Sequence, residues 1–216
     1  MIELKNITIG YKTKRIETVV YSNINELLNL GELVGLIGDN GVGKSTLIKT
    51  ITGNLEVLSG EVFIQSNSIK RYSAIELAKL ISIVTTEKIG GFNLTAWDVV
   101  ATGRTPYVNT FGTLTGLDEQ IVTTSLDKLS ILHLKTKLID ELSDGQRQKV
   151  MIAKSLAQQT PVIILDEPTA FLDYKSKHQL FETLKYLCEK ENKLILVSSH
   201  DLDLMNKYIA RSICLT

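Results

Sequence analysis

The residues with the clearest chemical meaning lie in the segment Gly38-Asp-Asn-Gly41-Val-Gly43-Lys44-Ser45. Its spacing matches the P-loop pattern, in which glycines let backbone N–H groups wrap around phosphates. Lys44 would supply positive charge for the β- and γ-phosphates, and the Ser45 hydroxyl would bind Mg²⁺. A glycine-rich turn can arise by chance, but an apolar run precedes this one and a helical pattern follows it, as phosphate binding requires. The residues expected to contact ATP are Gly38, Asp39, Asn40, Gly41, Val42, Gly43, Lys44, Ser45 and Thr46.

Two adjacent carboxylates, Asp166 and Glu167, follow the apolar run Val162 to Leu165. If this run is a buried strand, its carboxyl end lies at the edge of the sheet where open α/β folds bind ligands. We expect Asp166 to hold Mg²⁺ through its water shell. Glu167 points to the other side of the pleat and could polarise an attacking water as a general base. The alternative is an ordinary helix cap after a strand, but downstream of a P-loop the pair favours a hydrolytic site.

The elements that must position these groups follow an α/β pattern. Four short apolar runs lack alternation, which is typical of parallel strands covered on both faces: Leu33 to Ile37, Leu80 to Val84, Val162 to Leu165 and Leu194 to Val197. Helical patterns lie between them, at Lys44 to Thr52, Val150 to Gln158 and Lys175 to Glu189. The alternating stretch Ile2 to Ile9 and the short Gly60 to Ile64 predict an antiparallel sheet beside the main one.

The length of 216 residues suits one domain with an inserted lobe. Residues 73–146 have a mainly helical pattern broken by polar turns, and we expect them to form a helical subdomain. The core would then consist of residues 1–72 and 147–216. The predicted fold is a P-loop NTPase core with a mostly parallel sheet, a small antiparallel β subdomain at the amino terminus and an inserted helical subdomain.

Composition argues against several classes of protein. Lysine and arginine total 24 and aspartate and glutamate also total 24, so no charge surplus attracts nucleic acid. The amino terminus lacks a signal-peptide pattern, and no apolar stretch approaches the ~18 residues of a membrane span. Cys188 and Cys214 lack metal-ligand spacing, and we expect both to be small apolar fillers in a protein of the reducing cytosol.

A third motif is the segment Leu142-Ser143-Asp-Gly145-Gln146. Ser143 and Gln146 fit a capping box ahead of an apolar helical face, so a plain helix start would explain them. The segment also resembles the signature sequence of ABC transporter ATPases, with aspartate at its third position where glycine is commonest. This resemblance implies that Ser143, Gly145 and Gln146 bind the γ-phosphate at a helix amino terminus.

Other residues resemble the same family in order and spacing. Tyr11 lies where the family stacks an aromatic ring on adenine, although a single early tyrosine is more often a surface or core residue. The stretch Ala170 to Asp173 resembles the loop that communicates across the dimer, and His200 matches the histidine that contacts the γ-phosphate. The resemblance runs from residue 2 to 216, and it implies that Lys44, Glu167 and His200 are the catalytic residues.

The chain departs from the family pattern at two places. The glutamine that normally ends the strand before the helical lobe is missing, and Thr86 and Glu87 stand there instead. Thr86 aligns best by counting, but Glu87 has the length of glutamine and an oxygen that can bind Mg²⁺. We therefore expect Glu87 to be the substitute, the alternative being a solvated turn residue. The second departure is that the chain reaches Thr216 within an apolar run, where family members usually continue.

The segment Leu94 to Tyr107 resembles ATPases of iron-siderophore, haem and vitamin B12 importers, in which it faces the membrane subunits. We expect Trp97 and Arg104 to serve docking there, the alternative being an amphipathic helix with Trp97 in its core. The resemblance implies a homodimer with ATP between one chain's P-loop and the other's signature helix. Its further partners would be permease subunits at the cytoplasmic face of the cell membrane and, acting through them, a substrate-binding protein.

Three rival functions remain open. The chain could serve an importer of another cargo or a lipoprotein-release system within the same family. A soluble ABC ATPase that acts on DNA or ribosomes would usually carry a long coiled-coil insertion or a second ATPase domain, and the sequence shows neither. A small nucleotide kinase would lack the signature segment and the histidine at position 200.

Overall fold

The computed structural model describes residues 1–14, 16–85, 93–109 and 111–215. Its larger sheet has five strands, and every pairing in it is parallel. Their order is β6 (Ile81–Val84), β7 (Val162–Asp166), β8 (Leu194–Ser198), β3 (Leu33–Ile37) and β9 (Arg211–Cys214). Four of these strands confirm the four apolar runs, and β9 is a strand that the sequence pattern did not predict.

The absence of alternation in these strands is explained by the two cores that flank the sheet. In β7, Ile163 and Leu165 pack into the core on one face, whereas Val162 and Ile164 pack into the core on the other. These four residues of β7 are therefore buried, whichever face they occupy. The polar residues Asp166 and Ser198 lie at the carboxyl ends of β7 and β8, at the edge of the sheet that carries the site.

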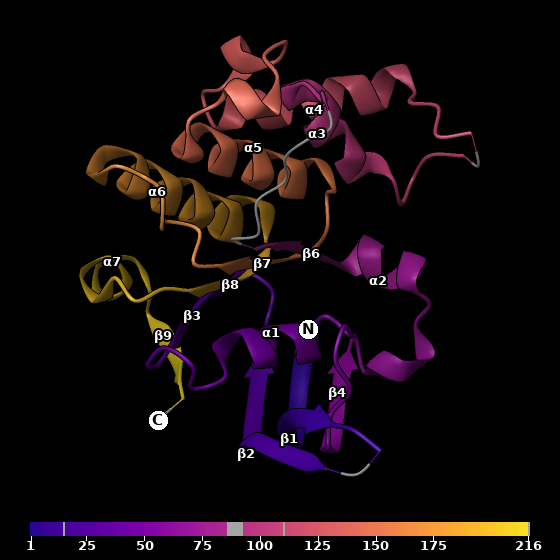
Figure 1. Ribbon diagram of the computed structural model, residues 1–216, viewed down its shortest axis with the longest axis vertical. Helices are drawn as coiled ribbons and strands as arrows, with labels where there is room; N and C mark the ends of the chain where they lie inside the picture. Colours follow the sequence, from indigo (N-terminus) through magenta and orange to yellow (C-terminus); the bar gives the residue numbers. More distant parts are fainter. Residues whose placement is uncertain (15, 86–92, 110, 216) are drawn as a thin grey trace.

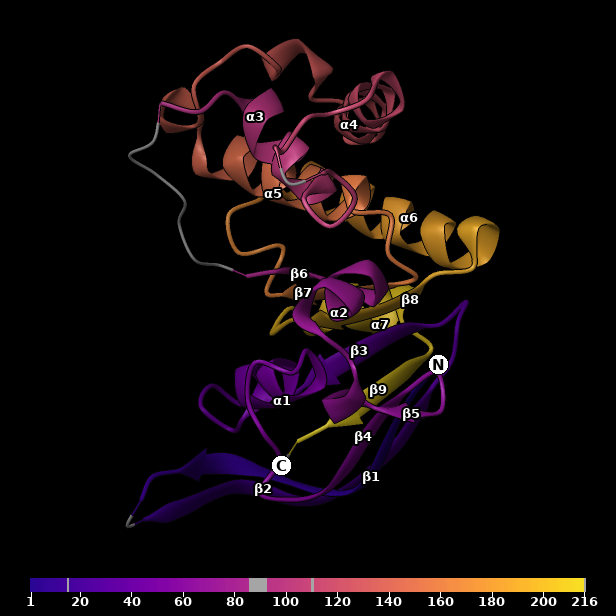
Figure 2. The same cartoon turned by 90° about the vertical axis from the view of Figure 1, so that its right-hand side faces the viewer.

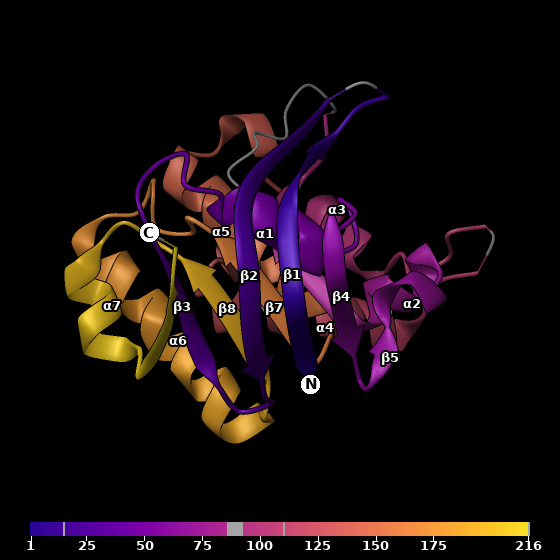
Figure 3. The ribbon, with the colours of Figure 1, turned by 90° about the horizontal axis from the view of Figure 1, so that it is seen from below.

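The second sheet is antiparallel, as expected, and lies across one side of the parallel sheet. Its four strands are β2 (Glu17–Leu28), β1 (Ile2–Lys12), β4 (Ser59–Ile64) and β5 (Asn67–Ser68), in that order. Helix α1 (Lys44–Ile51) is held between the two sheets (Figure 2), and its side chains Leu47, Ile48 and Ile51 are fully or almost fully buried there. Seen from below, β1, β2 and β4 cover α1 (Figure 3).

Helices cover the opposite face and form a layer at the far end of the molecule (Figure 1). The α-helices outside the two sheets' interface are α2 (Ala74–Leu80), α3 (Ala96–Ala101), α4 (Gly116–Lys128), α5 (Asp144–Ala157), α6 (Tyr174–Glu191) and α7 (Leu202–Tyr208). Short 3₁₀ turns are η1 (Ile69–Arg71), η2 (Thr102–Arg104), η3 (Leu132–Leu134) and η4 (Ile139–Glu141). Among the described helices, none combines the length and apolar character that crossing a membrane needs.

Two expectations require correction. Strand β6 lies within residues 73–146, yet it pairs with β7 along its whole length and so belongs to the parallel sheet. The parallel sheet therefore continues to Val84, beyond the expected boundary at residue 73. Cys188 is buried, as expected, but Cys214 is exposed on β9 and is not an apolar filler.

Candidate nucleotide-binding site

The P-loop connects β3 to α1, and the side chain of Lys44 folds back onto the loop. Gly43 precedes α1 with φ 119°, and a Cβ at this position would lie 2.6 Å from Cγ1 of Val20, so only glycine fits. The Lys44 ammonium donates to the carbonyl oxygens of Gly38 at 2.6 Å and Asp39 at 3.1 Å. The lysine charge is thus held at the loop, ready to exchange these carbonyls for phosphate oxygens.

Ser45 and Asp166 meet across the edge of the sheet. The Ser45 hydroxyl donates to Oδ2 of Asp166 at 2.9 Å, which joins the start of α1 to the end of β7. A hydroxyl and a carboxylate are oxygen ligands of the kind that Mg²⁺ prefers, and Mg²⁺ usually takes one or two carboxylates together with phosphate oxygens. Within the described ranges, no group of three or more His, Cys, Asp or Glu residues could hold a metal alone. The pair therefore fits Mg²⁺ bound jointly with a nucleotide.

Glu167 adopts a left-handed backbone conformation, with φ 48°, which is uncommon for a residue other than glycine. Its Oε2 lies 2.8 Å from Nδ1 of His200, so the structure brings these two predicted catalytic groups together. An ionised carboxylate can only accept hydrogen bonds, so Nδ1 of His200 must be the donor. In a neutral ring, Nε2 is then an acceptor, and it can donate to a phosphate only when the ring is protonated.

These groups surround a cavity of about 410 Å³ beside the P-loop. Tyr11 forms one wall, and its hydroxyl lies 3.1 Å from Oγ1 of Thr46. Tyr11 is 47% exposed, which suits an aromatic residue that stacks on a base. The cavity is lined by Tyr11, Val20, Asn40, Gly41, Gly43, Lys44, Ser45, Thr46, Asp166 and Glu167. Gly38 and Asp39 act through their contact with Lys44, and Val42 packs against the core.

The signature residues lie elsewhere in the chain's own structure. Ser143 caps α5: its hydroxyl accepts from the N–H of Gln146 at 3.3 Å, and Oε1 of Gln146 accepts from the Ser143 N–H at 3.1 Å. A Cβ on Gly145 would lie 2.9 Å from the carbonyl oxygen of Phe171, so glycine allows the 170–173 loop to approach. The described residues that line the P-loop cavity include none of these three.

A model of the ABC transporter family matches residues 21–170, more than half of the chain. The matched span contains the P-loop, the signature segment and the Asp166–Glu167 pair. The chain belongs to the ABC transporter family.

Relatives of this ABC transporter protein include ATP-binding subunits with named cargoes. The chain is 42% identical over 204 residues to an ABC transporter ATP-binding protein of Methanocaldococcus jannaschii, covering 94% of this chain and 69% of the relative. An iron(3+)-hydroxamate import ATP-binding protein of Bacillus subtilis is 32% identical over 202 residues, covering 94% and 74%. A cobalamin import ATP-binding protein of Halobacterium salinarum is 32% identical over 191 residues, or 88% of this chain, and the chain spans about half of its length, 48%.

The fold is that of solved ABC cassettes. One ATP-binding cassette, solved as a dimer in a post-hydrolysis state with ADP and phosphate, aligns with all of this chain at a TM-score of 0.87 and 28% identity, covering 94% of the solved chain. This likeness confirms the predicted P-loop core with its antiparallel and parallel sheets. The chain is an ATPase of the ABC family.

The expected docking role of Arg104 is wrong. Its side chain is 4% exposed, and the guanidinium donates to Oδ1 of Asp118 at 2.8 Å, to the Ala157 carbonyl at 2.8 Å and to Oε1 of Gln159 at 3.0 Å. These bonds join α5 to α4, and the residue is too deeply buried to serve as a docking contact. Trp97 is partly buried against the helical core, which favours the amphipathic-helix alternative.

The expected hinge residues Thr86 and Glu87 lie outside the described residues.

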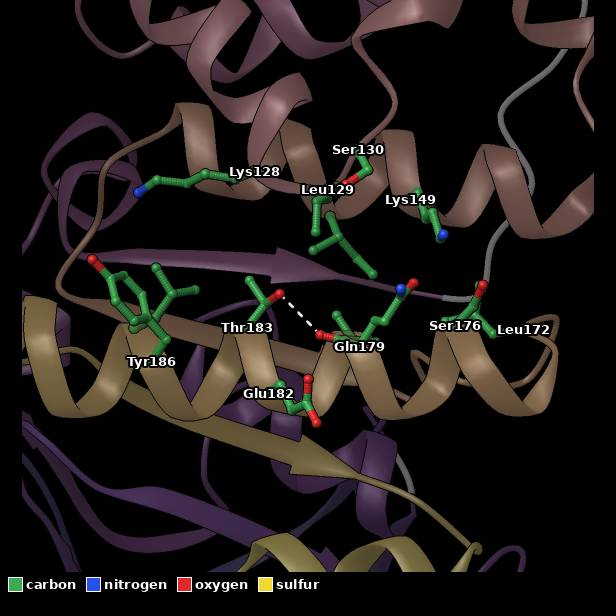
Figure 4. A pocket seen from close by; sticks show the side chains of 13 residues that line it. Lys128, Leu129, Ser130, Lys149, Leu172, Ser176, Gln179, Glu182, Thr183 and Tyr186 are labelled. Carbon is green, nitrogen blue, oxygen red and sulfur yellow. Dashed lines mark hydrogen bonds between the residues drawn. The ribbon is translucent and has the colours of Figure 1, made fainter.

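A second cavity, of about 400 Å³, lies between α5 and α6 (Figure 4). Lys128 and Lys149 approach it from the helical layer, and Gln179, Glu182 and Thr183 rise from α6. It contains neither a P-loop residue nor one of the paired carboxylates. The hydrolytic chemistry therefore belongs to the cavity beside the P-loop.

Two residues of the site, Val20 and Ser198, were not predicted from the sequence. Val20, on β2, lines the nucleotide cavity and faces Gly43. Ser198, at the end of β8, bonds to both Asp166 and Glu167. A polar residue at the end of a buried strand beside β7 was the available signal for Ser198. Nothing in the mostly exposed strand β2 marked Val20.

Proposed function

We propose that this chain is the ATP-hydrolysing subunit of an ABC importer for an iron chelate, haem or cobalamin. The observation that carries the proposal is the convergence of five residues around one cavity, Tyr11, Lys44, Ser45, Asp166 and Glu167, the last of which is bonded to His200. These residues supply a base-stacking surface, a phosphate cradle, oxygen ligands for a cation and a general base.

The proposed reaction uses each group in a defined role. Lys44 leaves the carbonyls of its own loop and neutralises charge on the phosphates. Bound Mg²⁺, held by Ser45 and Asp166, would neutralise further charge on the same phosphates. Glu167 accepts a proton from the attacking water through the oxygen that His200 does not engage. His200 keeps that carboxylate in place, and with its ring protonated it donates from Nε2 to the γ-phosphate.

A second copy of the chain would complete the site. Ser143, Gly145 and Gln146 stand at the amino terminus of α5 and do not line the cavity of their own chain. A helix amino terminus attracts phosphate, so these residues suit the γ-phosphate on the P-loop of a facing copy. In this homodimer, closure on ATP would move the inserted helical subdomain, which follows β6 in the chain, relative to the core. Glu87 is proposed to join the Mg²⁺ site during that closure.

The importer class is supported by two relatives that are named for iron(3+)-hydroxamate import and cobalamin import. Under this proposal the homodimer binds permease subunits at the cytoplasmic face of the cell membrane, and a substrate-binding protein acts through them. Nucleic acid has no part in it, in line with the balanced charge. An importer of another cargo or a lipoprotein-release system is the alternative within the family.

Affinity purification from solubilised membranes tests the proposal. We expect the tagged chain to recover a many-span membrane protein, and cells lacking the chain to lose uptake of ferric hydroxamate or cobalamin. The Lys44→Ala variant is the matched control, because it should recover the same partner without restoring uptake. Recovery of ribosomes or DNA in place of a membrane protein would contradict the importer and favour a soluble ABC ATPase.

A further inference from the structure

Ser198 bonds to both members of the Asp166–Glu167 pair, to the carboxylate of Asp166 and to the backbone N–H of Glu167. It ends β8 directly beside Asp166 in the register of the parallel sheet, and its side chain is fully buried, with 0% exposed. Its hydroxyl donates to Oδ1 of Asp166 at 2.6 Å and accepts from the N–H of Glu167 at 2.9 Å. One proton and one lone pair of a single hydroxyl thus serve both residues.

We infer that Ser198 is a positioning residue that orients the Asp166 carboxylate toward Mg²⁺ and fixes the backbone of the general base Glu167. The inference rests on the proposed function, because it assigns roles to the carboxylates of that site.

The hydrogen bonds divide the two oxygens of Asp166 between two elements. Oδ1 is engaged by Ser198 of β8, and Oδ2 is engaged by Ser45 of α1. When Ser45 turns its oxygen to a cation, Ser198 still holds Oδ1, so Oδ2 remains the oxygen that faces the cation. Without Ser198 the carboxylate could rotate about its terminal bond, because that torsion has a broad energy profile.

The same hydroxyl acts on Glu167 through the backbone. Glu167 holds φ at 48°, a conformation that its surroundings must stabilise. Ser198 accepts the Glu167 N–H, and this bond fixes the turn from which the side chain reaches His200. Loss of the hydroxyl would leave this N–H without its acceptor, and the Glu167 side chain would be held less firmly in position.

Ser198→Ala tests the inference, and Ser199→Ala is the matched control. Ser199 is also fully buried, but its hydroxyl accepts from the N–H of Asp201 at 3.1 Å and touches neither carboxylate. Both proteins are compared with the unchanged chain by the unfolding midpoint in urea and by binding of a fluorescent ATP analogue with and without Mg²⁺. Hydrolysis is then followed at saturating ATP across a series of Mg²⁺ concentrations.

For Ser198→Ala we expect analogue binding without Mg²⁺ to be unchanged. The Mg²⁺ concentration that gives half the maximal rate of hydrolysis should rise about 10-fold, as is common when a hydrogen-bond partner of a metal ligand is removed. The rate at saturating ATP should also fall, with little change in KM. Ser199→Ala should leave analogue binding, the Mg²⁺ dependence and the rate at saturating ATP unchanged.

Equal Mg²⁺ dependence in the two variants would overturn the role of Ser198. If Ser198→Ala does not fold, Ser198→Cys gives the same test, since a thiol has similar shape but is a weak donor. Failure of the proposed function would look different: the unchanged chain would not bind the ATP analogue or hydrolyse ATP with Mg²⁺.

Discussion

Replacing Arg104 by methionine should destabilise the fold strongly. Arg104→Met keeps an apolar stem but removes every donor of the guanidinium. The change breaks hydrogen bonds to Asp118, to the Ala157 carbonyl at the end of α5 and to Gln159. It also leaves Asp118, which is 6% exposed, as a buried carboxylate without its cation.

The size of the effect follows from burial. Removing one partner of a buried ion pair costs about 3–5 kcal/mol, because the other charge stays buried and uncompensated. The hydroxyl and N–H of Thr115 still bond to Oδ2 of Asp118, which favours the lower end of that range. A typical domain is stable by about 5–15 kcal/mol, so the loss would be a large fraction of the total.

Urea unfolding followed by circular dichroism measures this loss. Lys128→Met is the control, because the Lys128–Glu191 pair is 36% and 32% exposed and such pairs contribute about 0.2–1 kcal/mol. We expect the two variants to differ clearly in their free energy of unfolding. A change of less than about 1 kcal/mol in Arg104→Met would refute the reasoning, since it would match an exposed pair.

Acid unfolding adds a second observable for the same contact. Hydrogen bonds from the hydroxyl and N–H of Thr115, and then from Arg104, lower the pKa of Asp118 from 3.8 to about 2. A lowered folded-state pKa stabilises the protein above pH 3.8, and this contribution disappears as the pH falls through about 2. Arg104→Met should show a smaller loss in this window, because one of the causes is gone.

Three further predictions concern the site and the thiols. Lys44→Ala should abolish ATP binding in equilibrium dialysis while the protein stays folded, and unchanged nucleotide affinity in the folded variant would overturn the P-loop assignment. Glu87→Ala should weaken the Mg²⁺ dependence of hydrolysis and uncouple it from transport, whereas Thr86→Ala should be nearly silent; the opposite pattern would return the hinge role to the threonine. Burial raises the pKa of the Cys188 thiol to about 12, so in the native protein a thiol reagent at neutral pH should modify the exposed Cys214 alone.

The parts of the fold that sequence predicted are those whose cause is local. The strands at Leu33 to Ile37 and Val162 to Leu165 are buried on both faces, so their apolar runs are continuous. The P-loop and the Asp166–Glu167 pair are likewise defined by residues that are adjacent in the chain.

The parts that sequence did not predict depend on contacts between distant segments. Of the residues in β2, only Ile24 and Leu28 are buried, so this strand is held by its pairing with β1 and carries little apolar signal. Burial of Arg104 requires acceptors that lie 14 to 55 residues away in the chain. Ser198 meets Asp166, 32 residues away, only because β7 and β8 are neighbours.

Size-exclusion chromatography of Glu167→Gln with Mg-ATP tests the central claim, a shared site in which Glu167 drives hydrolysis, most directly. Loss of a general base slows hydrolysis by a factor on the order of 10²–10⁴, so ATP should persist and hold two copies together. We predict that Glu167→Gln elutes as a dimer with Mg-ATP, and that adding Ser143→Arg returns it to a monomer by blocking the facing phosphate site. A Glu167→Gln protein that stays monomeric with ATP, or that hydrolyses it at the unchanged rate, would contradict the account.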